Sequence, residues 1–509
     1  MLIKVPSATN SGLHTIKVEV EVDVAQKGLP TFGIVGLPSK AVDESKERVR
    51  TAIVNSGFKF PGNRIVVNLA PADVPKEGSF YDLPIALGIL SSTNDIKLPE
   101  NSLFFGELSL DGSLRHAKGA LLLALFAKEK GIDNIFIPQE SANEAAVIEG
   151  VNVYPVESLK ILLEHFSNEE GVIAACEYKE KDIKIFDNQA EFDMKEVIGQ
   201  EQGKRAMEIA AAGGHNLFML GSPGCGKTML ARALPGILPE LTEEESLEVT
   251  KIYSASGYMP PGGSIIKIRP FRSPHHTTSR VGLIGGGSRP KAGDISLAHR
   301  GVLFLDEFNE FPRSVIESLR QPMEDGNLTI SRSMEKVNFP AQFMLVASAN
   351  PCPCGFLNHP KKACTCTERQ IQEYRKRTSG PILDRIDLHV DLPVVDTNKL
   401  SQDFKVKEPL EDSQQVRQRI TKARQKQKQR FEKDSIYTNA EMKNRHIKKY
   451  CPLSKEIKQL LNQASAAFHL SARAYYKMIK VAQTIADLDN SDEINSSHMA
   501  EALQYRAKA

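Results

Sequence analysis

Hydrophobic and polar residues alternate near the start of the chain, with isoleucine or valine at every second position of 16–24. A period of two is typical of half-buried strands, and it extends over residues 14–36. A helix is predicted from an N-cap at Ser39 to about Ser56, ended by Gly57. Further elements are expected as a strand at 65–69, helices at 82–90 and 117–129, and apolar runs at 103–110 and 135–138. This mixture predicts an α+β domain over residues 1–166.

The pattern changes in the second third of the chain. Residues 167–195 have weak periodicity and many charges, which favours a linker. A helical segment at 196–216 then leads into short, wholly apolar runs at 217–220, 302–305 and 343–347. Such runs are typical of buried parallel strands, so residues 196–395 are expected to form an α/β core. Residues 396–509 are predicted to form a C-terminal helical domain.

Composition narrows the class of protein only a little. The chain has 509 residues, 41% hydrophobic residues, 25% charged residues and a net charge of +2, so any nucleic-acid contact must come from local patches. The N-terminus has no apolar signal-peptide core, and the longest apolar run, 120–127, is far too short for a membrane span. A soluble, cytoplasmic protein without membrane contact is expected.

A phosphate-binding loop follows the first apolar run of the core. Its residues match G-x-x-x-x-G-K-[ST] at every fixed position: Gly221, Ser222, Pro223, Gly224, Cys225, Gly226, Lys227 and Thr228. In such a loop backbone N–H groups turn toward a phosphate, the lysine reaches the β- and γ-phosphates, and the hydroxyl holds Mg²⁺. A strand before it and a helix after it favour this function over a glycine-rich turn with an ordinary surface lysine.

Two further polar clusters are predicted at the ends of strands. The strand 302–305 delivers Asp306 to hold Mg²⁺ and Glu307 to polarise the attacking water. The strand 343–347 leads to Asn350, at a position where AAA+ ATPases keep a polar residue that orients the same water. A plain turn asparagine is the alternative. The turn 197–199 resembles the adenine-side wall of the same proteins.

Two arginines resemble residues that complete AAA+ sites. SGPILDRIDLHVDLP (379–393) resembles the arginine-finger segment of magnesium-chelatase-type AAA+ proteins, which makes Arg385 the candidate. An ion pair of Arg385 with Asp384 or Asp387 is the alternative. The segment 470–488 resembles the lid helix, with Arg473 as its phosphate-sensing arginine. The resemblance implies a site completed between subunits, in a ring that is most commonly a hexamer.

The N-terminal domain resembles the proteolytic domain of Lon, an α+β fold of the ribosomal S5 domain 2 type. The similarity lies in APADVPKEGSFYDLPIALGIL (70–90) and in 105–138. Lon's pattern places Phe80 at the nucleophile and Leu121 at the base, and neither side chain can perform that chemistry. A shifted dyad of Ser79 and Lys118 is the alternative. A domain for interaction or assembly, without protease activity, is expected.

The wider layout resembles the YifB/ComM family of magnesium-chelatase-like AAA+ ATPases, the competence-linked DNA helicases. The similarity is carried by RPFRSPHHTTS (269–279), GDISLAHRGVLFLDE (293–307), LRQPMEDGNLTISR (319–332) and NPCPCG (350–355). It implies a hexameric ATPase that uses ATP and Mg²⁺ to move DNA branches during homologous recombination in natural transformation. The implied partners are single-stranded or branched DNA and recombination proteins. A chelatase-like or protein-remodelling ATPase that does not act on DNA is the alternative.

Local charge supports a DNA partner. The 43 residues from Lys251 to Gly293 contain no carboxylate and are expected to form an insertion in the core. A second candidate is a hairpin turning at Gly326–Asn327 that would enter a ring pore. The predicted DNA-contacting residues are Lys267, Arg269, Arg272, Arg280, Arg289, Lys291 and Arg332. The alternatives are a solvated loop or one that meets ATP phosphates. The basic run 414–430 is interpreted as a solvated helix or coil.

Four cysteines are close together after Asn350. Cys352, Cys354, Cys364 and Cys366 are spaced C-x-C, nine residues, C-x-C within the range 352–366. Four thiolates at this spacing can form a tetrahedral Zn²⁺ site with a structural role, in which His359 could replace one ligand. Reduced thiols without metal are the alternative.

Overall fold

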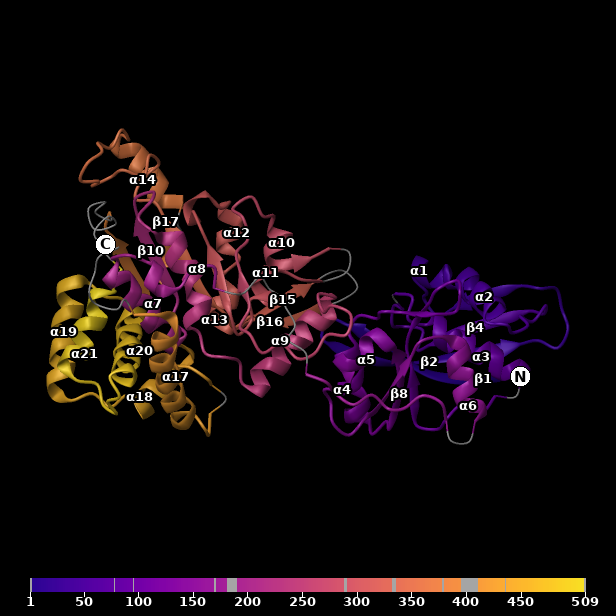
Figure 1. Ribbon diagram of the computed structural model, residues 1–509. Coiled ribbons are helices and arrows are strands. Elements are labelled where there is room, and N and C mark those ends of the chain that lie inside the picture. The colour runs from indigo at the N-terminus through magenta and orange to yellow at the C-terminus, as the bar shows by residue number, and fades with distance from the viewer. Residues whose placement is uncertain are drawn as a thin grey trace. The chain divides into compact units, whose positions relative to one another are not determined.

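The computed structural model describes residues 2–76, 78–94, 96–168, 171–180, 190–287, 291–331, 336–377, 380–394, 411–434 and 436–507. The chain divides into two compact units, Met1–Ile185 with Glu243–Ile266, and Phe186–Thr242 with Lys267–Ala509 (Figure 1). Within the described ranges, no helix combines the length and the apolar character that crossing a bilayer requires.

The first unit is built on strands that carry the alternating pattern of the sequence. Its elements are β1 (Leu2–Ser11), β2 (His14–Val24), β3 (Phe32–Val35), α1 (Lys40–Asp43), α2 (Ser45–Asn55), β4 (Ile65–Ala70), α3 (Asp82–Asn94), β5 (Ser102–Phe104), β6 (Glu107–Leu108), β7 (Leu114–Arg115), α4 (Ala120–Lys130), β8 (Asn134–Pro138), α5 (Gln139–Ala145), β9 (Asn152–Val156), α6 (Leu159–Ser167) and α9 (Glu243–Ser256). One sheet has the order β1-β2-β4-β3, and a second, parallel sheet has the order β5-β8-β9.

Two local features of this unit differ from the sequence prediction. Strand β1 was not predicted, because one of its inward positions is Ser7, which is fully buried and donates to Phe104 O at 2.8 Å. A polar residue at a buried position conceals the alternation. The predicted helix 39–56 occupies the expected residues but is divided at Glu44 into α1 and α2, and Ser39 makes no side-chain cap.

The segment Glu243–Ile266 belongs to the first unit although it lies between core motifs in the sequence. Helix α9 packs on α4. The buried carboxylate of Glu144 on α5 accepts from Ser254 Oγ at 2.5 Å and from Leu121 N at 3.0 Å. Asn143 donates to Gly263 O at 3.1 Å. The predicted insertion 251–293 is therefore not one structural element, since these contacts attach its first part to the N-terminal fold.

The second unit contains an α/β core and a helical C-terminal part. Its elements are α7 (Glu201–Gly213), β10 (Leu217–Gly221), α8 (Lys227–Ile237), β11 (Phe271–Arg272), α10 (Arg280–Ile284), β12 (Gly285–Gly286), β13 (Lys291–Ala292), α11 (Asp294–Leu297), β14 (Val302–Leu305), α12 (Arg313–Glu317), α13 (Arg320–Asp325), β15 (Asn327–Ser331), β16 (Lys336–Pro340), β17 (Met344–Ala349), α14 (Glu368–Arg377), α15 (Gly380–Leu383), β18 (Leu388–Leu392), α17 (Ser413–Arg430), α18 (Asn444–Tyr450), α19 (Lys455–Phe468), α20 (Ala472–Leu488) and α21 (Ser496–Gln504).

The core sheet has the strand order β11-β14-β17-β10-β18, and every adjacent pair is parallel. Residues 217, 302 and 388 are fully buried because helices cover the sheet. All five strands end at one edge, so the loops that follow β10, β11, β14 and β17 meet there. This edge is where the predicted site residues lie.

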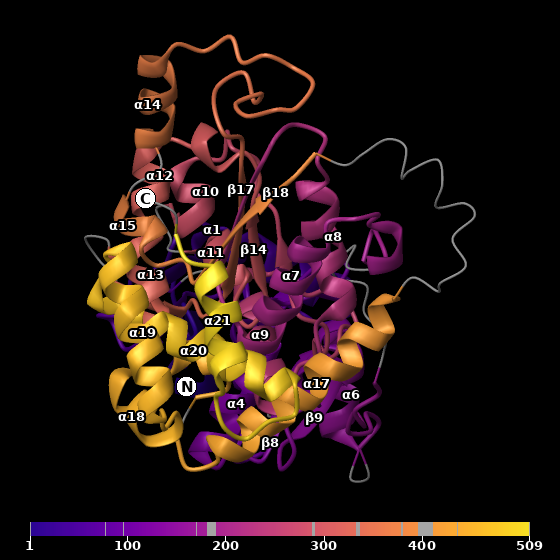
Figure 2. The same cartoon turned by 90° about the vertical axis from the view of Figure 1, so that its left-hand side faces the viewer.

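The C-terminal helices pack against the core rather than forming a separate body. Helix α17 contacts α7, α8 and α20, and α20 contacts α7 and α21 (Figures 1 and 2). The run 414–430, interpreted as a solvated helix or coil, is helix α17. One face of it is buried through Val416, Ile420 and Ala423. The solvated interpretation was wrong for most of its basic residues, which are half-buried, and arginines such as Arg419 and Arg424 donate to Glu208 and Ala211 O on α7.

The hairpin predicted at Gly326–Asn327 exists, but these two residues are not its turn. Strands β15 and β16 pair antiparallel from Asn327↔Pro340 to Ser331↔Lys336. Gly326 has φ 65° and ends helix α13, as a glycine C-cap does. The turn prediction was wrong because the glycine is used by the helix end rather than by the hairpin. Arg332 lies outside the described residues.

Candidate functional site

The loop Gly221–Thr228 connects β10 to α8 at the carboxyl edge of the core sheet. Gly224 and Gly226 have φ 79° and 94°, the left-handed region that glycine adopts without strain. A Cβ at Gly221 would lie 2.5 Å from Cys225 Sγ and 3.0 Å from Leu392 O, so only glycine fits between β18 and the loop. Cys225 is buried, and burial raises the pKa of its thiol. The loop therefore has the compact backbone that a phosphate cradle needs.

The side chain of Lys227 is held at the centre of this loop. Its Nζ donates to Gly221 O at 2.6 Å, to Ser222 O at 3.1 Å and to Asn350 Oδ1 at 3.1 Å. Burial lowers the pKa of Lys227 below its ordinary value. Asn350 directly follows β17, which pairs with β10, and this pairing brings the predicted water-orienting residue onto the predicted phosphate-binding lysine.

Asp306 and Thr228 form the second part of the site. Thr228 Oγ1 donates to Asp306 Oδ2 at 2.7 Å, and the Glu307 N–H donates to Asp306 Oδ1 at 3.0 Å. Ser348 Oγ also donates to Asp306 Oδ1. A hydroxyl and a carboxylate side by side suit the oxygen-only ligand preference of Mg²⁺, so these residues fit that metal.

Ser348 was not predicted as a site residue. Strand β17 is parallel to β14, and the register Ala347↔Leu305 puts Ser348 beside Asp306. The signal for it was present in the sequence, as a serine two residues before Asn350 in an otherwise apolar strand. Only the strand pairing shows which acid it supports.

Glu307 lies at the open side of the site, with a side chain 53% exposed. Its backbone is left-handed, with φ 52°, at the sharp turn after β14. The Nδ1 of His276 lies 3.3 Å from Glu307 Oε2. β11 runs parallel to β14, with Arg272 opposite Leu303, so the residues that follow β11 arrive beside the end of β14. His276 was not predicted to touch the site.

The predicted arginines share one carboxylate. Arg385 Nη2 donates to Glu324 Oε1, and Arg473 Nη2 lies 2.5 Å from the same oxygen. Burial would raise the pKa of Glu324, but the hydrogen bond from Arg473 and the charge of Arg385 hold it below its ordinary value. The alternative partners Asp384 and Asp387 are not the ion-pair partners of Arg385. Among the described residues, neither arginine bonds to Lys227, Asp306 or Glu307.

The loop that carries Arg385 is hydrogen-bonded to helix α20, the predicted lid helix. Lys477 Nζ donates to Asp384 O at 2.6 Å and to Ile386 O at 2.8 Å, the carbonyls on either side of Arg385. Burial lowers the pKa of Lys477 to about 8. Helix α20 also carries Arg473, so one helix supports both predicted arginines.

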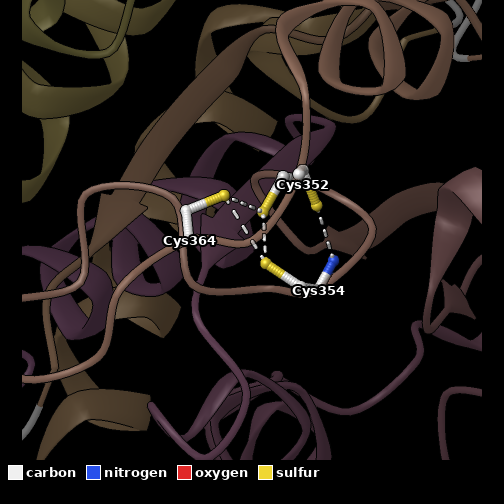
Figure 3. Close-up of side chains that lie close together, drawn as sticks. Cys352, Cys354 and Cys364 are labelled. Atoms are coloured by element: carbon white, nitrogen blue, oxygen red, sulfur yellow. Dashed lines mark hydrogen bonds between the residues drawn. The ribbon is translucent and has the colours of Figure 1, made fainter.

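The four clustered cysteines converge in space. Their sulfur atoms lie within 4.8 Å of one another, and Cys352, Cys354 and Cys364 are separated by 3.4 to 3.7 Å (Figure 3). Zinc with sulfur ligands at about 2.3 Å places tetrahedral sulfurs about 3.8 Å apart, so the cluster fits that metal. His359 is not among the converging side chains. Its Nδ1 accepts from the backbone N–H groups of Lys361 and Lys362.

The predicted DNA-contacting residues have different environments. Arg269 donates to Pro239 O and Arg300 O, and Arg272 forms an ion pair with Asp294 at 2.6 Å. These two side chains hold the fold together. Lys267, Arg280 and Lys291 are exposed. Arg289, like Arg332, falls outside the described residues.

The N-terminal unit does not assemble a protease dyad among its described residues. Phe80 stacks on Phe105 with centroids 4.5 Å apart, and Leu121 is fully buried. Ser79 donates to Glu107, and no hydrogen bond joins it to Lys118 in the described part of the chain. The hydroxyl and amine of the shifted dyad are therefore not paired.

Comparisons with known proteins cover nearly the whole chain. Family models for magnesium chelatase subunit ChlI match residues 193–400, 20–141 and, for its C-terminal part, 410–506. Competence protein ComM of Haemophilus influenzae is 41% identical over 503 residues, 98% of this chain and 96% of that protein. YifB of Escherichia coli is 41% identical over 504 residues, 97% of this chain and 95% of that protein. The magnesium-chelatase 38 kDa subunit of Rhodobacter capsulatus is 26% identical over 179 residues, 31% of this chain and 50% of that protein.

Proposed function

Because the chain belongs to the ComM/YifB family of magnesium-chelatase-like AAA+ ATPases, we propose that it is a hexameric, ATP-driven motor on DNA. Its activity would be helicase-like branch migration in homologous recombination during natural transformation, with recombination proteins as partners in the cytoplasm. The family makes the chain an ATPase that uses ATP and Mg²⁺. The observation that carries the proposal is the meeting of Lys227, Asp306, Glu307 and Asn350 at one sheet edge.

Each of these residues has a distinct task in ATP hydrolysis. Lys227 binds the phosphates, with the loop N–H groups around them. Thr228 and Asp306 would hold Mg²⁺, which neutralises charge on the phosphates. Glu307 accepts a proton from the attacking water, and Asn350 orients that water while contacting Lys227. Ser348 and the Glu307 N–H fix the orientation of the Asp306 carboxylate.

A ring is the assembly in which Arg385 and Arg473 reach a phosphate. In the single chain both bind Glu324 and neither bonds to Lys227, Asp306 or Glu307, so the proposal requires them to exchange Glu324 for a phosphate of a neighbouring copy. An arginine from the next subunit neutralises charge that builds on the transferring phosphoryl group. This arrangement supports the proposal that hydrolysis requires at least two copies.

The exposed basic residues support a DNA partner. Arg280, at the start of α10, and Lys291 are exposed in a stretch without carboxylates, and His276 of the same stretch lies against Glu307. Such residues contact phosphates without reading bases. Arg269 and Arg272 give no such support, since they bind within the fold. The Haemophilus relative is a competence protein, which agrees with handling of DNA.

Strand exchange on a three- or four-way DNA junction tests this function. The wild-type protein with ATP and Mg²⁺ should exchange strands, and Lys227→Ala should not. DNA should stimulate ATP hydrolysis, and DNA binding should weaken steeply with salt. ATP hydrolysis without exchange, DNA stimulation or salt dependence would overturn the DNA motor and favour a chelatase-like or protein-remodelling ATPase.

We also propose that Cys352, Cys354, Cys364 and Cys366 hold a structural Zn²⁺. The convergence of four sulfurs at tetrahedral spacing supports this assignment. Measurement of zinc in protein purified without added metal tests it.

A further inference from the structure

The cysteine loop begins at the nucleotide site. Asn350, whose Oδ1 accepts from Lys227 Nζ at 3.1 Å, lies two residues before Cys352. Cys352 is fully buried, and its carbonyl accepts from the Gly355 N–H at 2.9 Å. The position of the first cysteine therefore determines where the chain leaves β17, and with it the orientation of Asn350.

The same loop returns to touch the phosphate-binding loop. Gly355 has φ 80°, and a Cβ there would lie 2.6 Å from Cδ and Cγ of Pro223. That distance is too short for any side chain, so the backbone at Gly355 lies directly against Pro223. The cysteine loop thus contacts the nucleotide loop at two points, the lysine and the proline.

Apart from the cysteines, this loop is held by a few contacts within itself, such as the packing of Phe356 on His359 and the cation–π contact of Lys362 with Phe356. Between the end of β17 at Ala349 and the start of α14 at Glu368, the described residues form no helix or strand. Nearly all of them are exposed or half-buried, with only Cys352 and Gly355 buried. A segment with so few buried side chains cannot be ordered by hydrophobic packing, whereas a metal crosslink orders a chain of this length well.

We propose that the four-cysteine centre is a positioning site for the nucleotide-binding loop, and not merely a local staple. By closing the loop, bound zinc holds Gly355 against Pro223 and Asn350 against Lys227. Loss of the metal then releases both contacts and weakens nucleotide binding. The inference rests on the proposed zinc site and ATPase function, and it assigns to that site a control over affinity for ATP.

Two variants of the full-length chain distinguish metal binding by the cysteines from contact of their loop with the nucleotide-binding loop. Cys364→Ser with Cys366→Ser removes two ligands, and it should lose zinc and weaken binding of a fluorescent methylanthraniloyl ATP analogue roughly tenfold or more, as loss of outer-shell support does. Gly355→Ala keeps all four ligands but intrudes on Pro223. It should retain zinc and still weaken binding. Cys176→Ser, in the first unit, is the matched control and should change neither zinc content nor affinity.

The readouts are zinc content, affinity for the analogue, and hydrogen exchange of residues 221–228, which should accelerate when zinc is lost. If the wild-type protein contains zinc and binds the analogue equally well after chelation, this inference is overturned. Unchanged affinity for the analogue in either variant overturns it as well. Both results leave the ATPase and zinc proposals intact. Wild-type protein purified without zinc overturns the metal site and the inference with it. Wild-type protein that holds zinc but does not bind the analogue overturns the ATPase function instead.

Discussion

The imidazole Nδ1 of His276 lies 3.3 Å from the carboxylate Oε2 of Glu307. Two strands that are distant in sequence create this contact, because β11 pairs in parallel with β14 and both end at the same sheet edge. The ring of His276 also lies against His275, with centroids 4.1 Å apart and planes tilted by 35°. His276 is therefore a positioning residue for the proposed base, on the stretch that also carries exposed Arg280.

Removal of this imidazole should impair turnover without loss of nucleotide. We expect His276→Ala to lower kcat on the order of 10- to 100-fold, because a misplaced base loses rate steeply. His276→Asn, which keeps a donor, should recover part of the rate. His275→Ala is the comparison variant and should lower kcat less than His276→Ala does, since His275 bonds to Thr277 and only contacts the ring of His276. Steady-state phosphate release measures kcat, and binding of an ATP analogue measures nucleotide affinity. An unchanged kcat in His276→Ala would remove the residue from this role.

Substitutions of Lys227 and Glu307 should impair different steps of the ATPase reaction. Lys227→Ala should lose nucleotide binding, because its ammonium is the buried cation of the phosphate loop. Glu307→Gln should bind ATP but hydrolyse it roughly 10²- to 10⁴-fold more slowly, since the amide cannot accept the proton. Binding and single-turnover assays distinguish the two. Robust turnover by a verified Glu307→Gln preparation would show that another group is the base.

Mixed assemblies should reveal a site shared between copies. Arg385→Ala should lower ATP hydrolysis about 10³-fold, the scale of an arginine finger. A mixture of Arg385→Ala and Lys227→Ala proteins should regain activity. At some interfaces the Arg385→Ala subunit then supplies an intact loop and the Lys227→Ala subunit supplies an intact arginine. Arg377→Ala, a nearby exposed arginine that pairs with Glu310, is the control and should remain active. A mixture no more active than its parts would argue against a shared site.

Lys477, whose side chain is 11% exposed, should make stability depend on pH in a defined direction. Its pKa is about 8 in the folded protein, against about 10.4 in an unfolded chain. Between these pKa values the unfolded chain binds one more proton than the folded chain. The free energy of unfolding of the wild type therefore increases as pH rises, by at most about 1.4 kcal/mol per pH unit. Lys477→Met should lack this component.

Urea unfolding of both proteins at pH 7.5 and 9.5 checks this. The midpoint of the wild type should rise relative to that of Lys477→Met between the two values. A constant difference would mean that Lys477 keeps its proton in the fold, held by the carbonyls of Asp384 and Ile386.

Contiguous motifs were readable from the sequence because their chemistry and their secondary structure share one short segment. The loop 221–228 lies between an apolar strand and a helix, and β14 has the bounds predicted from its apolar run, Val302–Leu305. The arginine at 385 and the cysteines at 352–366 were likewise visible as local patterns. Family membership followed from the same stretches, and the near full-length relatives confirm it.

Contacts between distant segments were decided only by the tertiary structure. Parallel pairing of β11, β14 and β17 placed His276 on Glu307 and Ser348 on Asp306, and no local signal records which strands pair. In the sequence, the stretch 251–293 was a single segment without carboxylates. In the structure, Glu144 and Asn143 attach its first part to the N-terminal unit.

The sequence also does not show which group a charged side chain will bind. Arg269 and Arg272 were predicted to contact DNA, and in the fold they bind backbone carbonyls and a carboxylate, respectively. The sequence by itself determined the nucleotide chemistry, because phosphate binding needs a fixed order of residues along one loop. The tertiary structure decided which residues orient that chemistry, because orientation depends on neighbours that only strand pairing and helix packing bring together.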